Sequence, residues 1–162
     1  MNTRSTLKVL VLILTALIVL GLTFFFFHLK VISEQNVTLV ISDTSSGKVY
    51  GKWLLEKSGE FAVEFIHSVN QSPVREIFKI DGGVIRPHSV RFSSFGAGMD
   101  LGEGLTLSRD GDSFVMSGFD TSFSELNFIV GTVSDHLLFI NGETVSLLEL
   151  CGRNAHITIR IK

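Results

Sequence analysis

The segments FAVEFIH (residues 61–67) and VREIFKI (residues 74–80) decide the fold of this chain. In both, aromatic and β-branched residues recur at every second position, and this period of two is typical of β-strands with one face turned to a core. The first segment places Phe61, Val63, Phe65 and His67 on one face. The two segments therefore predict neighbouring strands of an antiparallel hairpin.

Similar strand patterns continue on both sides of this hairpin. We expect further strands at residues 37–41, 49–55, 105–109, 113–117, 136–140, 144–150 and 156–161. Asp-Gly and Asn-Gly pairs at residues 81–82, 110–111 and 141–142 supply the positive φ that tight hairpin turns need. About ten short strands with these turns predict an all-β fold, either an antiparallel sandwich or a small barrel. No segment after the N-terminal region shows helical periodicity.

The N-terminal region is of a different kind. Residues 9–27 read VLVLILTALIVLGLTFFFF and contain no charged side chain. About 20 apolar residues in a helix span the hydrocarbon core of a bilayer, where the backbone must satisfy its own hydrogen bonds. We therefore expect a short N-terminus at residues 1–8, a transmembrane signal-anchor at residues 9–29, a stem at residues 30–35 and a β domain at residues 36–162.

Flanking charges predict the orientation of this segment. Arg4 and Lys8 precede it, together with the α-amine, while Lys30 follows it. Positive flanks stay in the cytoplasm, so we expect a single-pass protein of the cytoplasmic membrane with its C-terminal domain outside. A cleaved signal peptide is the alternative, but it has a shorter apolar core followed by small residues. Residues 24–33, FFFFHLKVIS, offer bulky side chains instead, so we favour an uncleaved anchor.

Charge and cysteine content exclude some functions. The chain carries a net charge of −2, and nucleic-acid binding needs a cationic surface, so no nucleic-acid partner is expected. Cys151 is the single cysteine, so no intramolecular disulfide can form. We expect it to be a small buried residue near a strand end.

The first candidate site is a pair formed by His67 and Glu76. If the connecting loop spans residues 70–73, Val69 lies opposite Val74, and His67 lies opposite Glu76. Side chains directly across two strands have Cβ atoms about 4.5–5.5 Å apart, which allows a charge-assisted hydrogen bond. Such a pair could bind a ligand or sense pH, or it could simply fix the register of the hairpin. General-base catalysis is a third, weaker alternative.

The second candidate site is the glycine-rich segment FSSFGAGMD (residues 92–100). Glycine lets the backbone approach a ligand closely, although a tight bulge or crossover would use the same residues. The candidate ligand or partner contacts of the two segments together are Ser68, Arg75, Phe95, Gly96, Ala97 and Gly98.

These two segments also carry a family resemblance. HSVNQSPVRE (residues 67–76), then SFGAGM (residues 94–99), behind a single membrane anchor, resembles domain-of-unknown-function family 1850. The resemblance extends from about residue 37 to the C-terminus. It implies a small bacterial envelope protein without an established activity, whose gene lies beside those of TRAP-type transporters with a TAXI-type solute-binding component.

The resemblance and the residues together favour one function over two others. The favoured one is a membrane-anchored, non-catalytic accessory protein that contacts subunits of a TRAP/TAXI transporter. The alternatives are a free-standing domain that binds a small molecule or peptide, and a hydrolase using His67 and Glu76, whose nucleophile the sequence does not identify. We expect no enzyme, no cofactor and no metal site, because the histidines lack the spacing of metal ligands.

Overall fold

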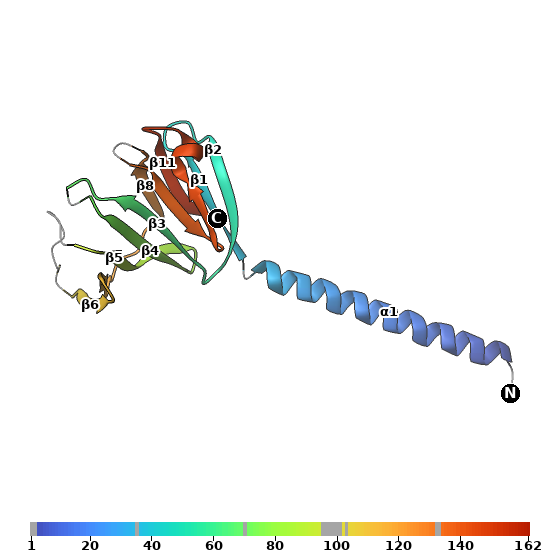
Figure 1. Ribbon diagram of the computed structural model, residues 1–162. Coiled ribbons are helices and arrows are strands. Elements are labelled where there is room, and N and C mark those ends of the chain that lie inside the picture. The colour runs from blue at the N-terminus through green and yellow to red at the C-terminus, as the bar shows by residue number, and fades with distance from the viewer. Residues whose placement is uncertain (1–2, 35, 70, 95–101, 103, 132–133) are drawn as a thin grey trace. The chain divides into compact units, whose positions relative to one another are not determined.

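The computed structural model divides the chain into two units, Met1–Asn36 and Val37–Lys162, which are described separately. It describes residues 3–34, 36–69, 71–94, 102, 104–131 and 134–162. Figure 1 shows a long helix in the first unit and β-sheets in the second.

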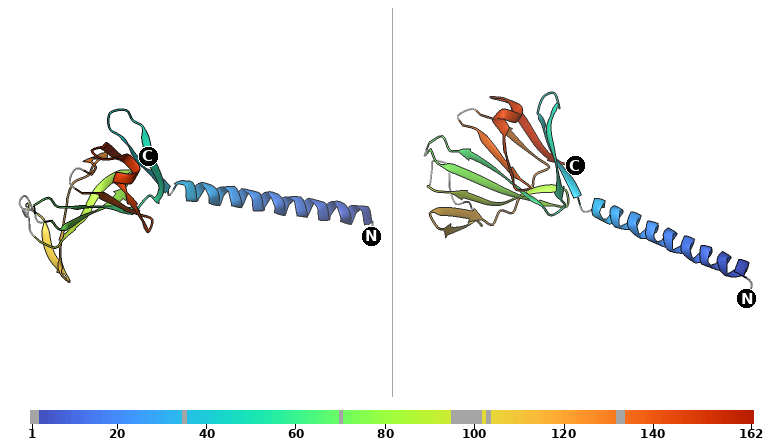
Figure 2. Two further views of the ribbon diagram at one scale, coloured as in Figure 1. Left: turned by 45° about the horizontal axis from the view of Figure 1, so that its top comes forward. Right: turned by 45° about the vertical axis from the view of Figure 1, so that its right-hand side comes forward.

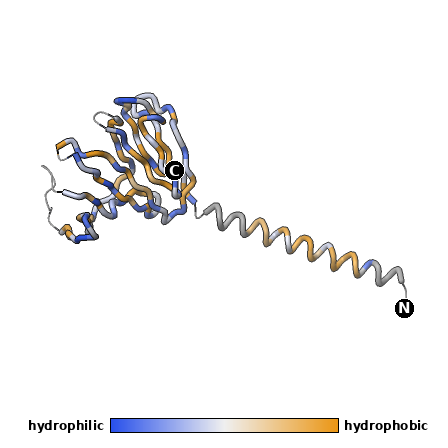
Figure 3. The backbone as a smooth tube through the Cα atoms, viewed as in Figure 1, coloured by the Kyte–Doolittle hydropathy of each residue, from blue (hydrophilic) through white to orange (hydrophobic). Residues whose placement is uncertain are grey.

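The first unit is helix α1, Thr3–Glu34. Its segment Leu10–Phe27 is long and apolar enough to cross a membrane, as Figure 3 shows by colour, and a signal sequence at an N-terminus would meet the same test. The hydroxyl groups of Thr15 and Thr23 donate to the carbonyl oxygens of Leu12 and Leu20, at 2.9 Å in both cases. The polar groups of these threonines are therefore satisfied inside the helix, as a lipid environment requires. The predicted apolar helix is confirmed.

The second unit consists mainly of two antiparallel sheets (Figure 2). The four-stranded sheet has the order β2 (Val49–Glu56), β1 (Asn36–Asp43), β11 (His156–Ile161) and β8 (Glu125–Ile129). The seven-stranded sheet has the order β10 (Glu143–Ser146), β9 (His136–Ile140), β3 (Glu60–Ile66), β4 (Pro73–Asp81), β5 (Val84–Phe92), β7 (Ser113–Ser117) and β6 (Thr106–Asp110). The predicted all-β, antiparallel fold is confirmed.

A large apolar cluster, which we call the main core, joins the two sheets. The four-stranded sheet contributes Leu39, Ile41, Ile157 and Ile159, and the seven-stranded sheet contributes Phe61, Val63, Phe78, Leu138 and Ile140. The rings of Phe61 and Phe78 stack with their centroids 5.2 Å apart. Most of these side chains are completely removed from solvent, so the main core holds the sandwich together.

A second apolar cluster, which we call the small cluster, lies on strands β4, β5 and β7 of the seven-stranded sheet. Its buried members are Val74, Phe92 and Met116. Partly buried apolar side chains surround them: Phe65, Val90, Leu105, Leu107, Phe114 and Phe119. The wider sheet therefore has two apolar regions, and the four-stranded sheet contributes residues to the main core alone.

A short helix replaces part of one expected strand. The prediction of a strand over residues 144–150 is wrong after Ser146, because helix α2 spans Leu147–Cys151. The Ser146 side chain caps this helix by accepting a hydrogen bond from the backbone N–H of Glu149 at 3.0 Å. Leu147 points into the main core and is fully buried. The expectation that no helix follows the N-terminal region is wrong for the same reason.

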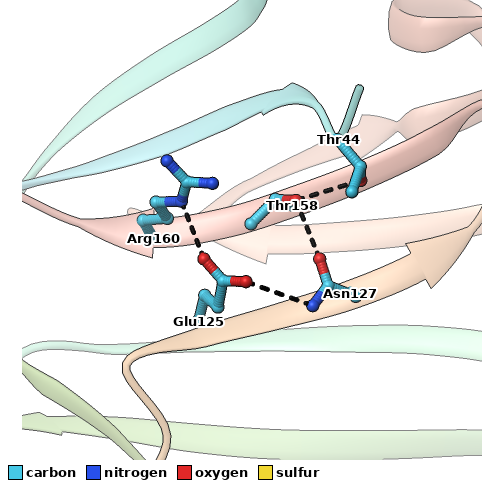
Figure 4. Close-up of polar contacts among 5 residues, drawn as sticks. All are labelled: Thr44, Glu125, Asn127, Thr158 and Arg160. Atoms are coloured by element: carbon cyan, nitrogen blue, oxygen red, sulfur yellow. Dashed lines mark hydrogen bonds and ion pairs between the residues drawn. The ribbon is translucent and has the colours of Figure 1, made fainter. Parts of the chain in front are cut away.

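Strand β8, which the sequence patterns did not single out, is held at the edge of its sheet by polar contacts (Figure 4). Asn127 accepts from the Thr158 hydroxyl at 2.8 Å, and Glu125 pairs with Arg160 at 3.0 Å. Thr158, which is fully buried, also shares a hydrogen bond with Thr44. Because side chains alternate along a strand, this network leaves the other face of β8 free to present its apolar residues.

Candidate functional site

His67 does not lie opposite Glu76. Strand β3 ends at Ile66, which pairs with Pro73, and Glu76 pairs with Val63. The prediction of a His67–Glu76 cross-strand pair is therefore wrong, together with the pairing of Val69 with Val74. The physical reason is the length of the turn, which begins at His67 and so is longer than expected. Glu76 therefore faces Val63 and not His67, a difference of four residues, or about 13 Å along a strand.

His67 instead organises the turn between the two strands. Its Nδ1 accepts a hydrogen bond from the backbone N–H of Val69 at 3.3 Å. Its backbone N–H donates to the Ser72 carbonyl, and its carbonyl accepts from the Gln71 N–H, both at 2.9 Å. An imidazole that accepts at Nδ1 carries its proton on Nε2 when neutral. The turn is thus held by its own groups.

The predicted contacts Ser68 and Arg75 also have partners within the chain. The Ser68 carbonyl accepts from the Gln71 side-chain amide at 2.6 Å. Arg75 pairs with Glu64, its direct cross-strand neighbour, at 2.8 Å, and its guanidinium lies 3.9 Å from the centre of the Phe139 ring. By strand alternation Arg75 and Glu76 occupy opposite faces of the sheet, so they do not form one site.

The remaining predicted contacts, Phe95, Gly96, Ala97 and Gly98, lie outside the described residues. The segment that leads to them is described as far as Ser94. The hydroxyl groups of Ser72 and Ser94 share a hydrogen bond at 3.3 Å. Ser134, which precedes β9, accepts from the Ile66 backbone N–H at 3.2 Å. Three connecting segments therefore meet at one end of the seven-stranded sheet, which we call the loop end.

The tip of the turn presents an apolar side chain to solvent. Val69 is 66% exposed, more than any other large apolar side chain in the described part of the β domain. Single exposed apolar side chains are common on protein surfaces, so Val69 is a candidate contact only together with the segments that meet at the loop end.

Comparison with known families gives one match. The domain of unknown function DUF1850 matches residues 61–147, which is more than half of the chain. The chain belongs to this family. The DUF1850 match runs from β3 to the start of α2 and includes the three connecting segments that meet at the loop end. No curated protein and no solved structure shows significant similarity to the chain.

Glu76 occupies an unusual position within the DUF1850 region. Its cross-strand neighbours are Val63 on β3 and Val90 on β5, so it stands on the apolar inner face of the sheet. Val63 belongs to the main core and Val90 to the small cluster. Burial raises the pKa of the Glu76 carboxyl above its ordinary value of 4.5. No hydrogen bond or ion pair joins this carboxyl to the part of the chain that the structure describes.

His136 is a second titratable group on the inner face. Its ring stacks on Phe65 with centroids 5.5 Å apart and meets Phe128 edge-on at 6.1 Å. Burial lowers the pKa of His136 below its ordinary value of 6.5, and the nearby Asp135 partly opposes this effect. The alternation in HLLFI (residues 136–140) could have revealed this position, since it places His136 on the same face as Leu138 and Ile140.

The single thiol, Cys151, is poorly suited to act as a nucleophile. The expectation of a buried cysteine near a strand end is wrong, because Cys151 is partly buried at the end of α2. Partial burial raises the pKa of its thiol to about 11. Within the described ranges no group of three or more His, Cys, Asp and Glu side chains is placed to hold a metal ion.

Proposed function

We propose that the protein is a membrane-anchored accessory protein of the bacterial envelope that docks on a TRAP-type solute transporter, with α1 as an uncleaved anchor. The apolar segment Leu10–Phe27 supports the anchor. The flanking charges support an extracytoplasmic β domain. The transporter as partner rests on the resemblance to the family whose genes accompany TAXI-type systems.

The convergence of segments at the loop end carries the docking role. His67 makes hydrogen bonds within the turn that it begins, and Ser72 connects the turn to Ser94 of the glycine-rich segment. Hydrogen bonds that already restrict these groups reduce the conformational entropy lost on binding, which favours association. Val69 at its tip is the apolar group that a partner would cover.

The role that we propose is non-catalytic. A hydrolase based on His67 and Glu76 would need the two groups within hydrogen-bond distance or joined by one water molecule. His67 lies in the turn, whereas Glu76 pairs with Val63 in the middle of the hairpin. The register therefore removes the geometric basis for that alternative.

The anchor can be tested by the mass of the mature protein. A C-terminally tagged chain is purified from its own membranes, and its intact mass is measured. We expect the mass of the full sequence in the membrane fraction. A mass that corresponds to loss of the apolar segment would show a cleaved signal sequence and refute the anchor.

Docking can be tested by affinity purification of the tagged full-length protein in mild detergent, followed by mass spectrometry. We expect the wild type to recover a transporter membrane subunit or the solute-binding protein. Val69→Asp places a charge at the tip without touching the hydrogen bonds of the turn, so recovery should fall by about tenfold or more. Val49→Asp is the matched control, because Val49 is also exposed but lies at the start of β2.

Two results would contradict the docking proposal. One is a wild-type preparation without any transporter subunit. The other is equal recovery with Val69→Asp and Val49→Asp, which would place the contact away from the turn. His67→Ala adds a further comparison, since loss of its bond to the Val69 N–H should loosen the turn and weaken recovery less than the charge does.

A free-standing binding domain is the second candidate, and Glu76 is the observation that favours it. Among the described residues this carboxyl has no hydrogen-bond or ion-pair partner, and such a group on the inner face of a sandwich is costly to keep unless it serves a ligand.

A further inference from the structure

A cavity of about 330 Å³ lies beside Glu76, between the inner face of β4 and β5 and the edge strand β8. Its volume is in the range of small-molecule sites. The side chains that matter most for its chemistry are Glu76, Val90, Phe119, Phe123, Leu126 and Phe128. They come from both sheets and from the segment that connects β7 to β8.

The walls of this cavity are mainly apolar and aromatic, with the polar residues Ser89, Thr121 and Asn127 also in its lining. Phe119 and Phe123 come from the connecting segment, and Phe128 comes from β8. Phe123 is 41% exposed, so the cavity is open to solvent beside this ring. The backbone of Phe123 forms a β-bridge with Ile85. Aromatic faces carry partial negative charge and attract cations.

Glu76 is the single titratable side chain among the described residues that line the cavity. Other charged or titratable groups on the neighbouring strands do not line the cavity: Glu64, Arg75 and Arg91 lie on the other face of the sheet, and Glu125 pairs with Arg160 outside the sandwich. His88 of β5 is exposed to solvent. His136 of β9 shares the inner face and its ring contacts Phe128, but it does not line the cavity, and burial lowers its pKa below the ordinary value. Asp120, on the connecting segment, is exposed to solvent. No cation of the described chain therefore neutralises the Glu76 carboxylate.

We propose that this cavity binds a small organic cation, a primary ammonium group attached to an apolar body, with the ammonium at the Glu76 carboxylate and the body against the phenylalanine rings. The ammonium supplies the missing charge partner and up to three hydrogen-bond donors. The apolar body replaces water along the aromatic walls. This site does not depend on the docking role, because Glu76 lies on the inner face of the sheet and Val69 lies at the turn.

The proposal can be tested by calorimetric titration of the full-length protein in detergent micelles with 2-phenylethylamine. Binding should be measurable at neutral pH, and 2-phenylethanol, which has the same body without the charge, should bind at least about tenfold more weakly. Glu76→Gln should lose about tenfold or more in affinity for the amine. Glu64→Gln is the matched control, since it removes a carboxylate from the other face of the sheet and should leave the affinity unchanged.

The pH dependence gives an independent readout. An ammonium prefers the ionised carboxylate, so affinity should fall as the pH is lowered through the pKa of Glu76. Carbon-13 NMR of the Glu76 carboxyl should show that the bound amine lowers its pKa. Glu76→Gln removes a buried charge and should fold at least as well as the wild type, which thermal melting verifies.

Three results would overturn the proposal: no binding of the amine, equal binding of the amine and the alcohol, or equal binding by wild type and Glu76→Gln. Affinity that rises as the pH falls would also overturn it, since the carboxylic acid would then be the binding form. None of these results bears on the affinity purification with Val69→Asp, so the two proposals can fail separately.

Discussion

The main core and the small cluster occupy the same inner face of the seven-stranded sheet, yet they differ in what covers them. Leu39, Ile41, Ile157 and Ile159 of the four-stranded sheet cover the main core. The small cluster is packed instead by partly buried side chains such as Phe119 and Leu105. The first region is closed by regular structure on both sides, and the second is closed partly by connecting segments.

This difference shows where the fold leaves room for function. Complete burial between two sheets gives stability but leaves no access to solvent. A cavity forms at the boundary, where β8 ends the four-stranded sheet and Glu76 interrupts the apolar surface between Val63 and Val90. We infer that the main core stabilises the domain and that the boundary carries the binding chemistry.

Truncation of Phe61 should have the largest effect on stability. Phe61→Ala removes a fully buried ring from the main core and should lower the free energy of unfolding by about 3–5 kcal/mol. Met116→Ala in the small cluster should cost less, about 2 kcal/mol, because the looser cover can relax. Urea unfolding followed by the fluorescence of Trp53, the single tryptophan, which packs against the main core, would measure both. Equal costs would contradict the comparison between the two clusters.

Glu76→Gln should raise the free energy of unfolding at neutral pH, whereas the two truncations lower it. The folded-state pKa of Glu76 is raised, so its contribution to the free energy of unfolding is most favourable below pH 4.5. That contribution is lost as the pH rises through the folded-state pKa. Removal of the charge should therefore stabilise the protein at pH 7, by about 1–2 kcal/mol, with no gain below pH 4.5. Thermal melting across this pH range would check it. A gain that is independent of pH would mean that the charge is not its source.

Ser146→Ala should lower the free energy of unfolding by a smaller amount, because it weakens α2, which packs Leu147 into the main core. The substitution removes the cap of α2 and should cost about 1 kcal/mol. Ser146→Asp retains a capping side chain and is the matched control. Both are measured by urea unfolding, and an equal loss in the two variants would show that the cap is not what matters.

Protonation of His136 should have the smallest effect on the stability of the domain. Its folded-state pKa is lowered, so stability is full above pH 6.5 and declines as the pH falls toward the folded pKa. His136→Phe keeps an aromatic ring between Phe65 and Phe128 but cannot be protonated, so the decline between pH 6.5 and 5 should become shallower. Thermal melting in this range would show it, and identical pH profiles would contradict the assignment.

Much of the fold could be predicted because apolar residues at every second position indicate a β-strand with one face buried. The hairpin at β3 and β4 and the strand β11 follow from this pattern, and the apolar helix follows from its length and lack of charge. Helix α2 was missed because a five-residue helix is too short to show a period. Its signal was local: Ser146 and Glu149 have the spacing of a capping box, and Gly152 follows as a C-cap.

The candidate site was harder to predict because it depends on register. The residue types were informative, since Glu76 proved to be a carboxyl on an apolar face. The pairing with His67 failed because nothing in the sequence fixed where the turn begins, and every cross-strand pair follows from that position. The cavity beside Glu76 could not be foreseen either, since β8, which supplies one wall, is distant in sequence from β4.

The partial burial of Cys151 has a consequence for its redox chemistry in the compartment that we propose for this domain. With a pKa of about 11, roughly one thiol in ten thousand is ionised at neutral pH. Oxidation and disulfide exchange proceed through the thiolate. If the domain lies outside the cytoplasmic membrane as we propose, neighbouring copies should therefore resist covalent cross-linking through Cys151 under oxidising conditions, although each carries an odd cysteine.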